Sequence, residues 1–245
     1  MRHPSSPLSV PFGKAGIWAL AGASVAAAAT AWWVTDSAPY PYAQHRLLDL
    51  PLPFLSWQRL ADQLQPLPGE RILEIGPGTG LQSLQVAPRL GADGRLDIVD
   101  IQQEMLDHVM RRAAAAGLDT IAPTLADARE LPFDDATFDA AYLVTALGEI
   151  PDVPAALHEL RRVLKPTGRL VVGEFFDRHQ IRPAALARHA NAVGLHVIRQ
   201  SGPALAYFSL LRPCTSAADS RPHAAAAADS RAHAAAADRP AAVDS

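Results

Sequence analysis

Three glycines at alternate positions are the feature of this sequence best suited to holding a ligand. Gly76, Gly78 and Gly80 lie in Leu73–Gly80 (LEIGPGTG), after an apolar run that is typical of a buried strand. Glycine has no Cβ, so the backbone can turn sharply there and approach a ligand closely. A helix that begins behind such a turn presents N–H groups without partners inside the helix. The spacing G-x-G-x-G differs from the G-x-G-x-x-G of dinucleotide-binding domains.

Two carboxylates follow other runs that resemble strands. Asp100 comes directly after Arg95–Val99, and a carboxylate at that place accepts hydrogen bonds from both hydroxyls of a ribose. Asp127 comes after the weaker run Ile121–Leu125, where it could bond to the amino group of an adenine. The alternatives are a helix N-cap or a solvated loop acid for Asp100, and a solvated loop acid for Asp127. The glycine turn favours the ligand-binding interpretation of Asp100.

These side chains require an alternating pattern of strands and helices to bring them together. Strands are predicted at 71–75, 95–99, 121–125, 138–145, 169–175, 196–200 and 207–212. Helices are predicted at 81–90, 103–116, 153–164 and 183–193, and the third of them ends in a KPTG turn at 165–168. The pattern predicts an α/β fold: a Rossmann-like, doubly wound, mainly parallel seven-stranded sheet with helices on both faces. In such sheets ligands bind beyond the carboxyl ends of the strands.

The composition changes at both ends of this pattern, which predicts three regions: 1–37, 38–212 and 213–245. Residues 15–34 carry no charge over a length that can span a bilayer, which favours a membrane anchor. A helix lying on a surface, a cleaved signal peptide and an extension outside the working protein are the alternatives. The tail repeats ADSRPHAAAA as ADSRAHAAAA and has almost no large apolar side chains, so we expect it to be disordered.

Charge and cysteine content exclude several classes of function. Lys and Arg number 22 against 25 Asp and Glu, a formal net charge of −3, so the basic excess of a nucleic-acid-binding protein is absent. The single cysteine, Cys214, permits neither an intrachain disulfide nor a zinc or iron–sulfur site built from cysteines. We therefore expect no nucleic-acid partner and no metal site.

Four segments, in order, resemble the motifs of class I S-adenosylmethionine-dependent methyltransferases. They are LEIGPGTG (73–80), VDIQQEML (99–106), DARELPFDDATFD (127–139) and LRRVLKPTGRLVV (160–172). The resemblance covers about residues 70–176 and is greatest to the type 11 group, which includes the quinone-biosynthesis C-methyltransferases. It departs from that pattern in having KPTG where K-P-G-G is more usual. It implies an enzyme that uses S-adenosylmethionine as its cofactor and transfers the methyl group by in-line displacement to a small acceptor.

The resemblance also implies which residues contact the cofactor. The methionine part would meet the glycine turn, the ribose and adenine would meet residues after the second and third strands, and the sulfonium end would lie after the fourth. The residues at the methionine part are Glu74, Gly76, Gly78 and Gly80. Asp100 would hold the ribose, and Ile101 would lie beside the adenine. Asp127 and Ala128 would meet the edge of the adenine, and Thr145 would lie near the sulfonium.

An acid or base is needed only where the acceptor must lose a proton before it attacks. Glu149, Glu174 and His179 follow strand ends and are the candidates, with solvated acids and a surface imidazole as the ordinary alternatives. The acceptor pocket is expected from 38–60, the loop after the fourth strand and the loop 174–182. Tyrosines could line it, face the sulfonium charge or belong to the core or rim: Tyr40, Tyr42, Tyr142 and Tyr207.

Two rival functions predict different features. An NAD-dependent dehydrogenase would have the other glycine spacing, whereas an S-adenosylmethionine-binding scaffold or regulator without turnover would have the same sequence signals. Because S-adenosylmethionine is a cytosolic metabolite, we expect the domain in the cytoplasm, attached to the inner face of the cell membrane if residues 15–34 insert. That apolar segment and the quinone-enzyme resemblance favour a lipophilic acceptor.

Overall fold

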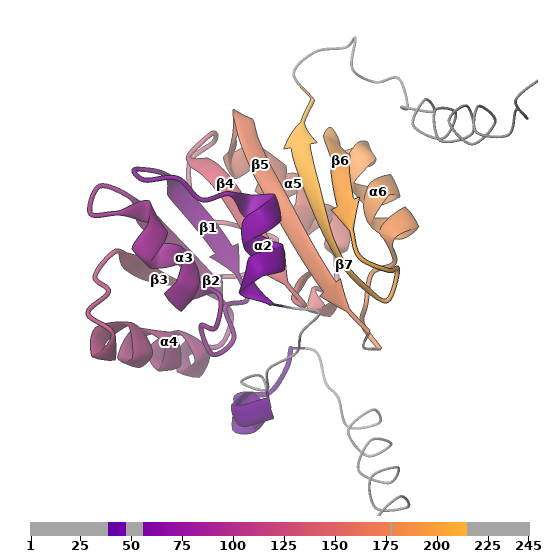
Figure 1. The fold of residues 1–245 in the computed structure, drawn as a ribbon. Coiled ribbons are helices and arrows are strands. Elements are labelled where there is room, and N and C mark those ends of the chain that lie inside the picture. Colours follow the sequence, from indigo (N-terminus) through magenta and orange to yellow (C-terminus); the bar gives the residue numbers. More distant parts are fainter. Residues whose placement is uncertain (1–38, 48–55, 177, 215–245) are drawn as a thin grey trace, which may run out of the picture. The chain divides into compact units, whose positions relative to one another are not determined.

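The computed structural model describes residues 39–47, 56–176 and 178–214, which form an α/β fold with helices on both faces of one sheet (Figure 1). The seven strands are ordered β3-β2-β1-β4-β5-β7-β6. They are β1 (Arg71–Ile75), β2 (Arg95–Asp100), β3 (Ile121–Leu125), β4 (Phe138–Val144), β5 (Leu164–Phe175), β6 (Leu195–Ser201) and β7 (Ala206–Pro213). The helices are η1 (Tyr42–Leu47), α2 (Trp57–Leu64), α3 (Ser83–Leu90), α4 (Gln103–Ala115), η3 (Leu147–Glu149), α5 (Val153–Val163) and α6 (Pro183–Ala192).

The sheet is mainly parallel, as the sequence predicts. β1 lies between β2 and β4 and runs parallel to both, whereas β7 runs antiparallel to its neighbours β5 and β6. The register pairs Ile75 with Val99 on one side and with Leu143 on the other. Three neighbouring strands therefore end almost level, and the segments that follow them start from the same edge.

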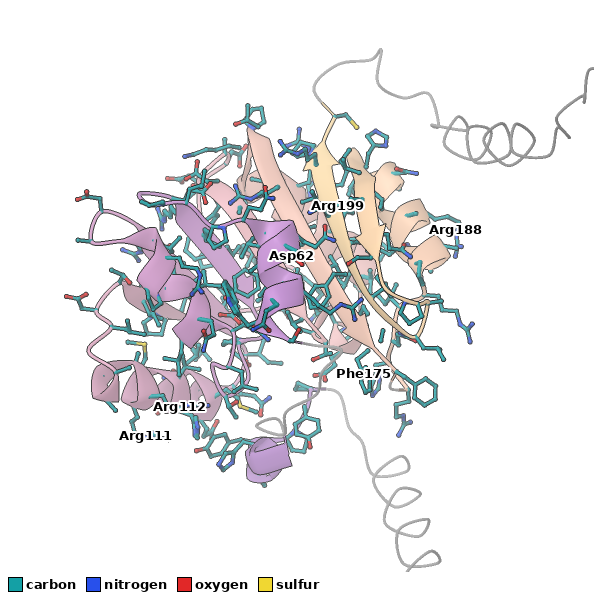
Figure 2. All side chains as sticks on the ribbon, viewed as in Figure 1. Asp62, Arg111, Arg112, Phe175, Arg188 and Arg199 are labelled. Carbon is teal, nitrogen blue, oxygen red and sulfur yellow. The ribbon has the colours of Figure 1, made fainter. Side chains whose placement is uncertain are left out.

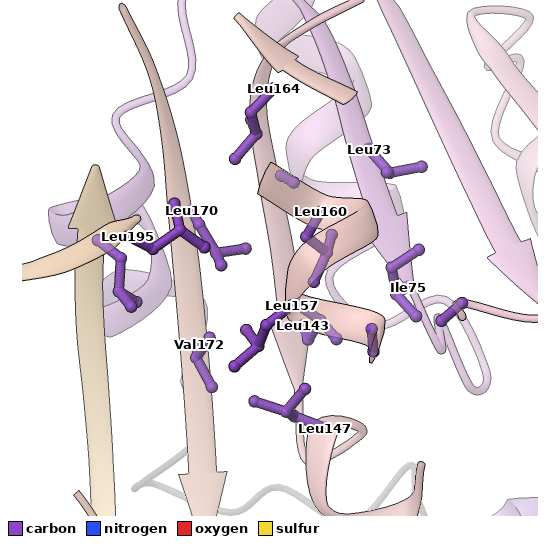
Figure 3. Close-up of a cluster of buried hydrophobic side chains, with 14 of the residues drawn as sticks. Leu73, Ile75, Leu143, Leu147, Leu157, Leu160, Leu164, Leu170, Val172 and Leu195 are labelled. Carbon is purple, nitrogen blue, oxygen red and sulfur yellow. The ribbon is translucent and has the colours of Figure 1, made fainter. Parts of the chain in front are cut away.

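The alternation of side chains along β1 explains why helices cover both faces. Ile72 packs into a buried cluster with residues of α2, α3 and α4, whereas Leu73 and Ile75 point the other way into a cluster with α5 and α6. Figure 3 shows the second cluster, in which Leu157 and Leu160 of α5 pack against the strands. This period of two is the pattern expected for a strand buried on both faces.

The KPTG segment differs from the prediction, because it is a bulge inside β5 and not a turn before it. Leu164 pairs with Phe138 and Arg169 pairs with Ala140, so four residues of β5 stand opposite Asp139 alone. The ammonium of Lys165 lies 2.6 Å from the carboxylate of Asp139 and fixes the bulge. Gly168 is required in this bulge, because a Cβ there would lie 2.9 Å from the carbonyl oxygen of Lys165.

Helix α2 corrects part of the expected acceptor pocket. Residues 38–60 are predicted to line that pocket. Leu60 and Leu64, however, are completely buried in the core cluster on the face of the sheet that α2, α3 and α4 cover. α2 contacts β5 and β7. The portion of 38–60 within this helix therefore supports the sheet.

The predicted apolar segment 15–34 and the repeated tail lie outside the described residues, so both interpretations stay predictions. Within the part of the chain that the structure describes, no helix is long and apolar enough to cross a membrane.

A fully buried carboxylate near the amino end of β2 yields a stability prediction. Asp97 forms ion pairs of 2.8 Å with both Arg71 and Arg95, whose side chains are 38% and 53% exposed. Because the two guanidiniums can be rehydrated, we expect Asp97→Ala to lower the free energy of unfolding by about 2 kcal/mol, less than for a wholly buried pair. Urea denaturation measures this, with Asp93→Ala in the exposed preceding loop as the control. Equal midpoints for the two variants would show that the ion pairs do not stabilise the fold.

Candidate functional site

The glycine turn after β1 has the backbone shape that its sequence predicts. Gly76, Gly78 and Gly80 all have positive φ, at 65°, 55° and 83°, a region that side chains with a Cβ seldom occupy. The N–H of Gly76 donates to the carbonyl of Val99 at 2.9 Å, which ties the turn to the end of β2. A Cβ on Gly76 would lie 2.7 Å from the Cβ of Ala146, so the turn also packs closely against the segment after β4.

Two hydrogen bonds, one part-buried and one buried, hold the turn on the side of α3 and α4. Arg112 of α4, labelled in Figure 2, donates to the carbonyl of Thr79 at 2.7 Å. Ser83, the first residue of α3, donates from its hydroxyl to the carboxylate of Glu74 at 2.5 Å. The turn is therefore held by contacts with both α3 and α4.

Glu74 is 3% exposed, so its carboxyl group lies behind the glycine turn and not on the surface. Burial raises the pKa of Glu74 to about 7, against the opposing effects of Ser83 and of Tyr142, its neighbour on β4. The negative charge of Asp100 raises it slightly further. The resemblance predicts that Glu74 contacts the methionine part of the cofactor. In the structure its carboxyl group is buried and accepts a hydrogen bond from the hydroxyl of Ser83.

Asp100 stands at the carboxyl end of β2, partly buried and beside the glycine turn. Its Oδ1 accepts the backbone N–H of Gln102 at 2.9 Å. Burial raises the pKa of Asp100 to about 6, although its hydrogen bonds to the N–H groups of Gln102 and Ile101 oppose the rise. The next side chain, Ile101, is 52% exposed and offers an apolar surface at the same edge.

At the predicted adenine end of the site, Arg129 already binds the carboxylate of Asp127. Asp127 accepts three hydrogen bonds from the guanidinium of Arg129, at 2.6 to 3.1 Å, and a fourth from its backbone N–H at 2.8 Å. The contact with Arg129 lowers the pKa of Asp127. Ala128 is 6% exposed and packs into the core cluster under α5. A ligand amino group would therefore share Asp127 with Arg129.

Thr145 follows β4 in a conformation that costs energy. Its φ of 57° is left-handed, which is rare for a residue branched at Cβ and costs on the order of 1–3 kcal/mol. Two hydrogen bonds hold it there: its N–H donates to Gly173 at 2.8 Å, and its hydroxyl donates to the carbonyl of Val144 at 2.7 Å. Such strain tends to occur at functional sites, and this residue is next to Ala146, which contacts the glycine turn.

The three candidate acids and bases, Glu149, Glu174 and His179, come from segments that pack together. A Cβ on Gly148 would lie 2.0 Å from the carbonyl of His179, so η3 and the loop after β5 touch at a glycine. Glu174 is 1% exposed and accepts the N–H of Ile181 at 3.4 Å, which ties it to the same loop. Glu149 accepts the backbone N–H of Tyr40 at 2.9 Å.

The tyrosines divide between core and edge. Tyr142 and Tyr207 are completely buried, and the hydroxyl of Tyr207 donates to the carbonyl of Ile181 at 2.5 Å. Tyr40 and Tyr42 are partly buried and lie beside Gln102, a residue that sequence reasoning missed. A glutamine in a loop carries no pattern of its own, and the bonded positions are 60 and 62 residues apart, so only the fold reveals the contact.

A cavity of about 520 Å³ lies between α2 and β6, and none of the residues predicted to contact the cofactor lines it. It is lined by polar residues that include Asp62 and Arg199, both labelled in Figure 2. The guanidinium of Arg199 is already bonded to Gln63 and to the carbonyl of Asp62. The glycines, Asp100 and Thr145 meet instead at the carboxyl edge of the sheet.

Residues 72–168, which contain that edge, match a family model described as a methyltransferase domain. The ubiquinone/menaquinone biosynthesis C-methyltransferase UbiE of Cellvibrio japonicus (strain Ueda107) is 40% identical over 115 residues, 45% of this chain and 45% of that protein. This stretch is a class I methyltransferase domain. The 27-O-demethylrifamycin SV methyltransferase of Amycolatopsis mediterranei (strain S699) is 32% identical over 145 residues, 59% of this chain and 49% of that protein. The chain spans about half the length of these curated relatives.

Solved structures share the fold of the methyltransferase domain. A SAM-dependent methyltransferase from Aquifex aeolicus has a TM-score of 0.62 at 19% identity and covers 70% of this chain and 97% of its own. The [4+2]-cyclase SpnF has a TM-score of 0.56 at 22% identity and covers 74% of this chain and 84% of its own. At these identities the likeness shows the fold alone, and that fold also supports a reaction that is not named as a methyl transfer.

The titration of Asp100 predicts how ligand binding by the methyltransferase domain depends on pH. Two ribose hydroxyls can donate to the ionised carboxylate, but a protonated carboxyl group loses part of this accepting capacity. Since the pKa of Asp100 is about 6, affinity for S-adenosylhomocysteine should be full above that pH, fall as the pH drops through it, and level off at the lower affinity of the protonated form. Titrations between pH 5 and 7.5 measure this. The Asp100→Asn variant, which cannot ionise, should lack the fall, and an affinity that rises on acidification would contradict the assignment.

Proposed function

We propose that this chain transfers the methyl group of S-adenosylmethionine to a small acceptor. The observation that carries the proposal is that the glycine turn and Asp100 leave neighbouring strands at one level, within the segment that matches the methyltransferase family. S-adenosylmethionine is the cofactor, supported by that match and by the fold neighbour CalH, whose structure is a complex with SAH.

The residues at this edge fit the cofactor. A left-handed turn without side chains admits the methionine part close to the backbone, and the partly buried carboxylate of Asp100 suits the hydroxyls of a ribose. The exposed side chain of Ile101 offers an apolar contact for the adenine. The methionine part, the ribose and the adenine would therefore each meet a chemically suitable neighbour.

When bound, S-adenosylmethionine supplies a methyl group on a cationic sulfur, which a nucleophilic acceptor atom displaces in line. For such a displacement the protein contributes mainly alignment and the exclusion of water. Asp100 would orient the ribose, and the glycine turn, fixed by Arg112 and Ser83, would set the depth of the methionine part. No strong base is required unless the acceptor carries a proton on the attacking atom.

The acceptor in this proposal is small and lipophilic. The names of the relatives support this, since they include quinone-biosynthesis C-methyltransferases. Phe176, which directly follows β5 and is 48% exposed, offers an apolar surface at the carboxyl edge of the sheet. Membrane attachment through residues 15–34, with the domain on the cytoplasmic side, would give access to such acceptors and remains part of the proposal.

A test with radiolabelled methyl groups separates this function from binding without turnover. The full-length protein is incubated with methyl-labelled S-adenosylmethionine and a panel of demethylated quinones, phenols and amines. The proposal predicts labelled product and an equal amount of S-adenosylhomocysteine with at least one acceptor class. Cofactor binding with no label transferred to any acceptor would favour the alternative, an S-adenosylmethionine-binding scaffold or regulator without turnover.

A further inference from the structure

The segment before η1 has an unusual supply of hydrogen-bond donors. Residues 39–42 read Pro-Tyr-Pro-Tyr, and proline has no backbone N–H, so the only backbone donors in these four residues are those of Tyr40 and Tyr42. A residue before proline is biased towards an extended backbone. The two N–H groups of such an extended segment need acceptors from other parts of the chain.

Both donors are taken by side chains at the carboxyl edge of the sheet. The N–H of Tyr40 donates to Oε2 of Glu149 at 2.9 Å, and the N–H of Tyr42 donates to Oε1 of Gln102 at 3.3 Å. Nε2 of Gln102 then donates to the carbonyl of Tyr40 at 2.9 Å. The amide of Gln102 thus bonds to the segment as a neighbouring strand would.

The position of the two anchors decides what the segment crosses. Gln102 follows β2 and Glu149 follows β4, and β1 lies between these strands. The peptide of Tyr40 is bonded to both anchors, so residues 39–42 pass across the end of β1, where the glycine turn begins. We call residues 39–42 the strap.

The far end of the strap is fixed to α4. The ring of Tyr42 stacks on His45 with centroids 4.6 Å apart, and its hydroxyl lies 3.3 Å from Nδ1 of His108. Arg111 donates to the same hydroxyl at 3.3 Å. Gln102 also connects the strap to Asp100, the residue proposed to bind the ribose, because the backbone N–H of Gln102 donates to the carboxylate of Asp100 at 2.9 Å.

We propose that the strap closes over the cofactor site and that Glu149 and Gln102 are positioning residues that hold it there. This rests on the proposed function for the identity of the ligand beneath the strap. It changes the role of Glu149, which sequence reasoning offers as an acid or base. The carboxylate is used as an acceptor for the Tyr40 N–H, and the strap must release that bond whenever the cofactor exchanges.

Hydrogen exchange at single amides tests the anchoring itself in the full-length protein. We expect slow exchange at Tyr40 and Tyr42, slower again with S-adenosylhomocysteine. Glu149→Ala should free the Tyr40 amide, whereas Glu149→Gln keeps an acceptor oxygen and should restore its protection. Gln102→Ala should free the Tyr42 amide, and Gln103→Ala, at the exposed neighbouring position, should free neither.

Calorimetric titration with S-adenosylhomocysteine tests the role of the closed strap. Glu149→Ala and Gln102→Ala should each weaken binding about three- to tenfold, and Glu149→Gln should recover most of the loss. A Glu149→Gln variant as impaired as Glu149→Ala would overturn the positioning role. If the wild type binds S-adenosylhomocysteine but the amides of Tyr40 and Tyr42 exchange freely, the proposed closure by the strap is wrong and the proposed function stands. If both amides are protected but the wild type does not bind, the proposed function fails, and with it the strap's role over a cofactor.

Discussion

Replacing Gly78 by valine should reduce binding of S-adenosylmethionine by more than a hundredfold while leaving the sheet folded. Gly78 has a φ of 55° in the middle of the turn that, in the function we propose, the methionine part of the cofactor approaches. A branched side chain there would disfavour this backbone conformation and occupy the space of the ligand. Calorimetric titration measures the binding, and far-ultraviolet circular dichroism measures the fold.

Gly117 offers a matched control for this substitution. Its φ is 68°, and a Cβ there would have no atom within 4 Å, so Gly117→Val brings similar backbone strain at a place with open space. The residue follows α4 and precedes β3, at the opposite edge of the sheet. Normal affinity is expected in this variant. Equal losses of affinity in both variants would mean that general destabilisation, and not the turn itself, causes the effect.

Changing Asp100 to alanine should weaken cofactor binding at least tenfold. Hydrogen bonds to a charged group contribute about 1.5–3 kcal/mol each, and about 1.4 kcal/mol corresponds to a factor of ten. The exposed Asp119, in the loop before β3, is the appropriate control. Asp97 would be a poor one, because its loss also breaks the ion pairs with Arg71 and Arg95. If Asp119→Ala impairs binding as much as Asp100→Ala, the ribose assignment is wrong.

The sequence predicts those parts of this protein that depend on local pattern. The short apolar run of β1 predicts a strand that is buried on both faces, and in the structure Ile72 packs on one face and Leu73 on the other. The three glycines indicate a left-handed turn, because few other residues adopt positive φ without strain. These two signals are sufficient to predict a ligand site at one edge of a parallel sheet.

Contacts between distant segments carry no such pattern. The bond from Tyr40 to Glu149 joins residues 109 positions apart, and nothing in either residue type requires it. The four-residue bulge in β5 depends on Lys165 meeting Asp139 across the sheet, so the sequence indicates a turn where the structure has a strand. The deep position of Glu74 depends on the hydroxyl of Ser83, nine residues later. Such features follow from the assembled fold and become visible only in it.

The central claim is that the carboxyl edge of this sheet binds S-adenosylmethionine, and a titration of the full-length protein tests it most directly. Heat is measured as S-adenosylhomocysteine is added to the wild type and to Asp100→Ala, with NAD titrated separately. We expect saturable one-to-one binding of S-adenosylhomocysteine to the wild type, at least tenfold weaker binding to the variant, and no binding of NAD. Saturable binding of NAD together with no binding of S-adenosylhomocysteine would contradict it.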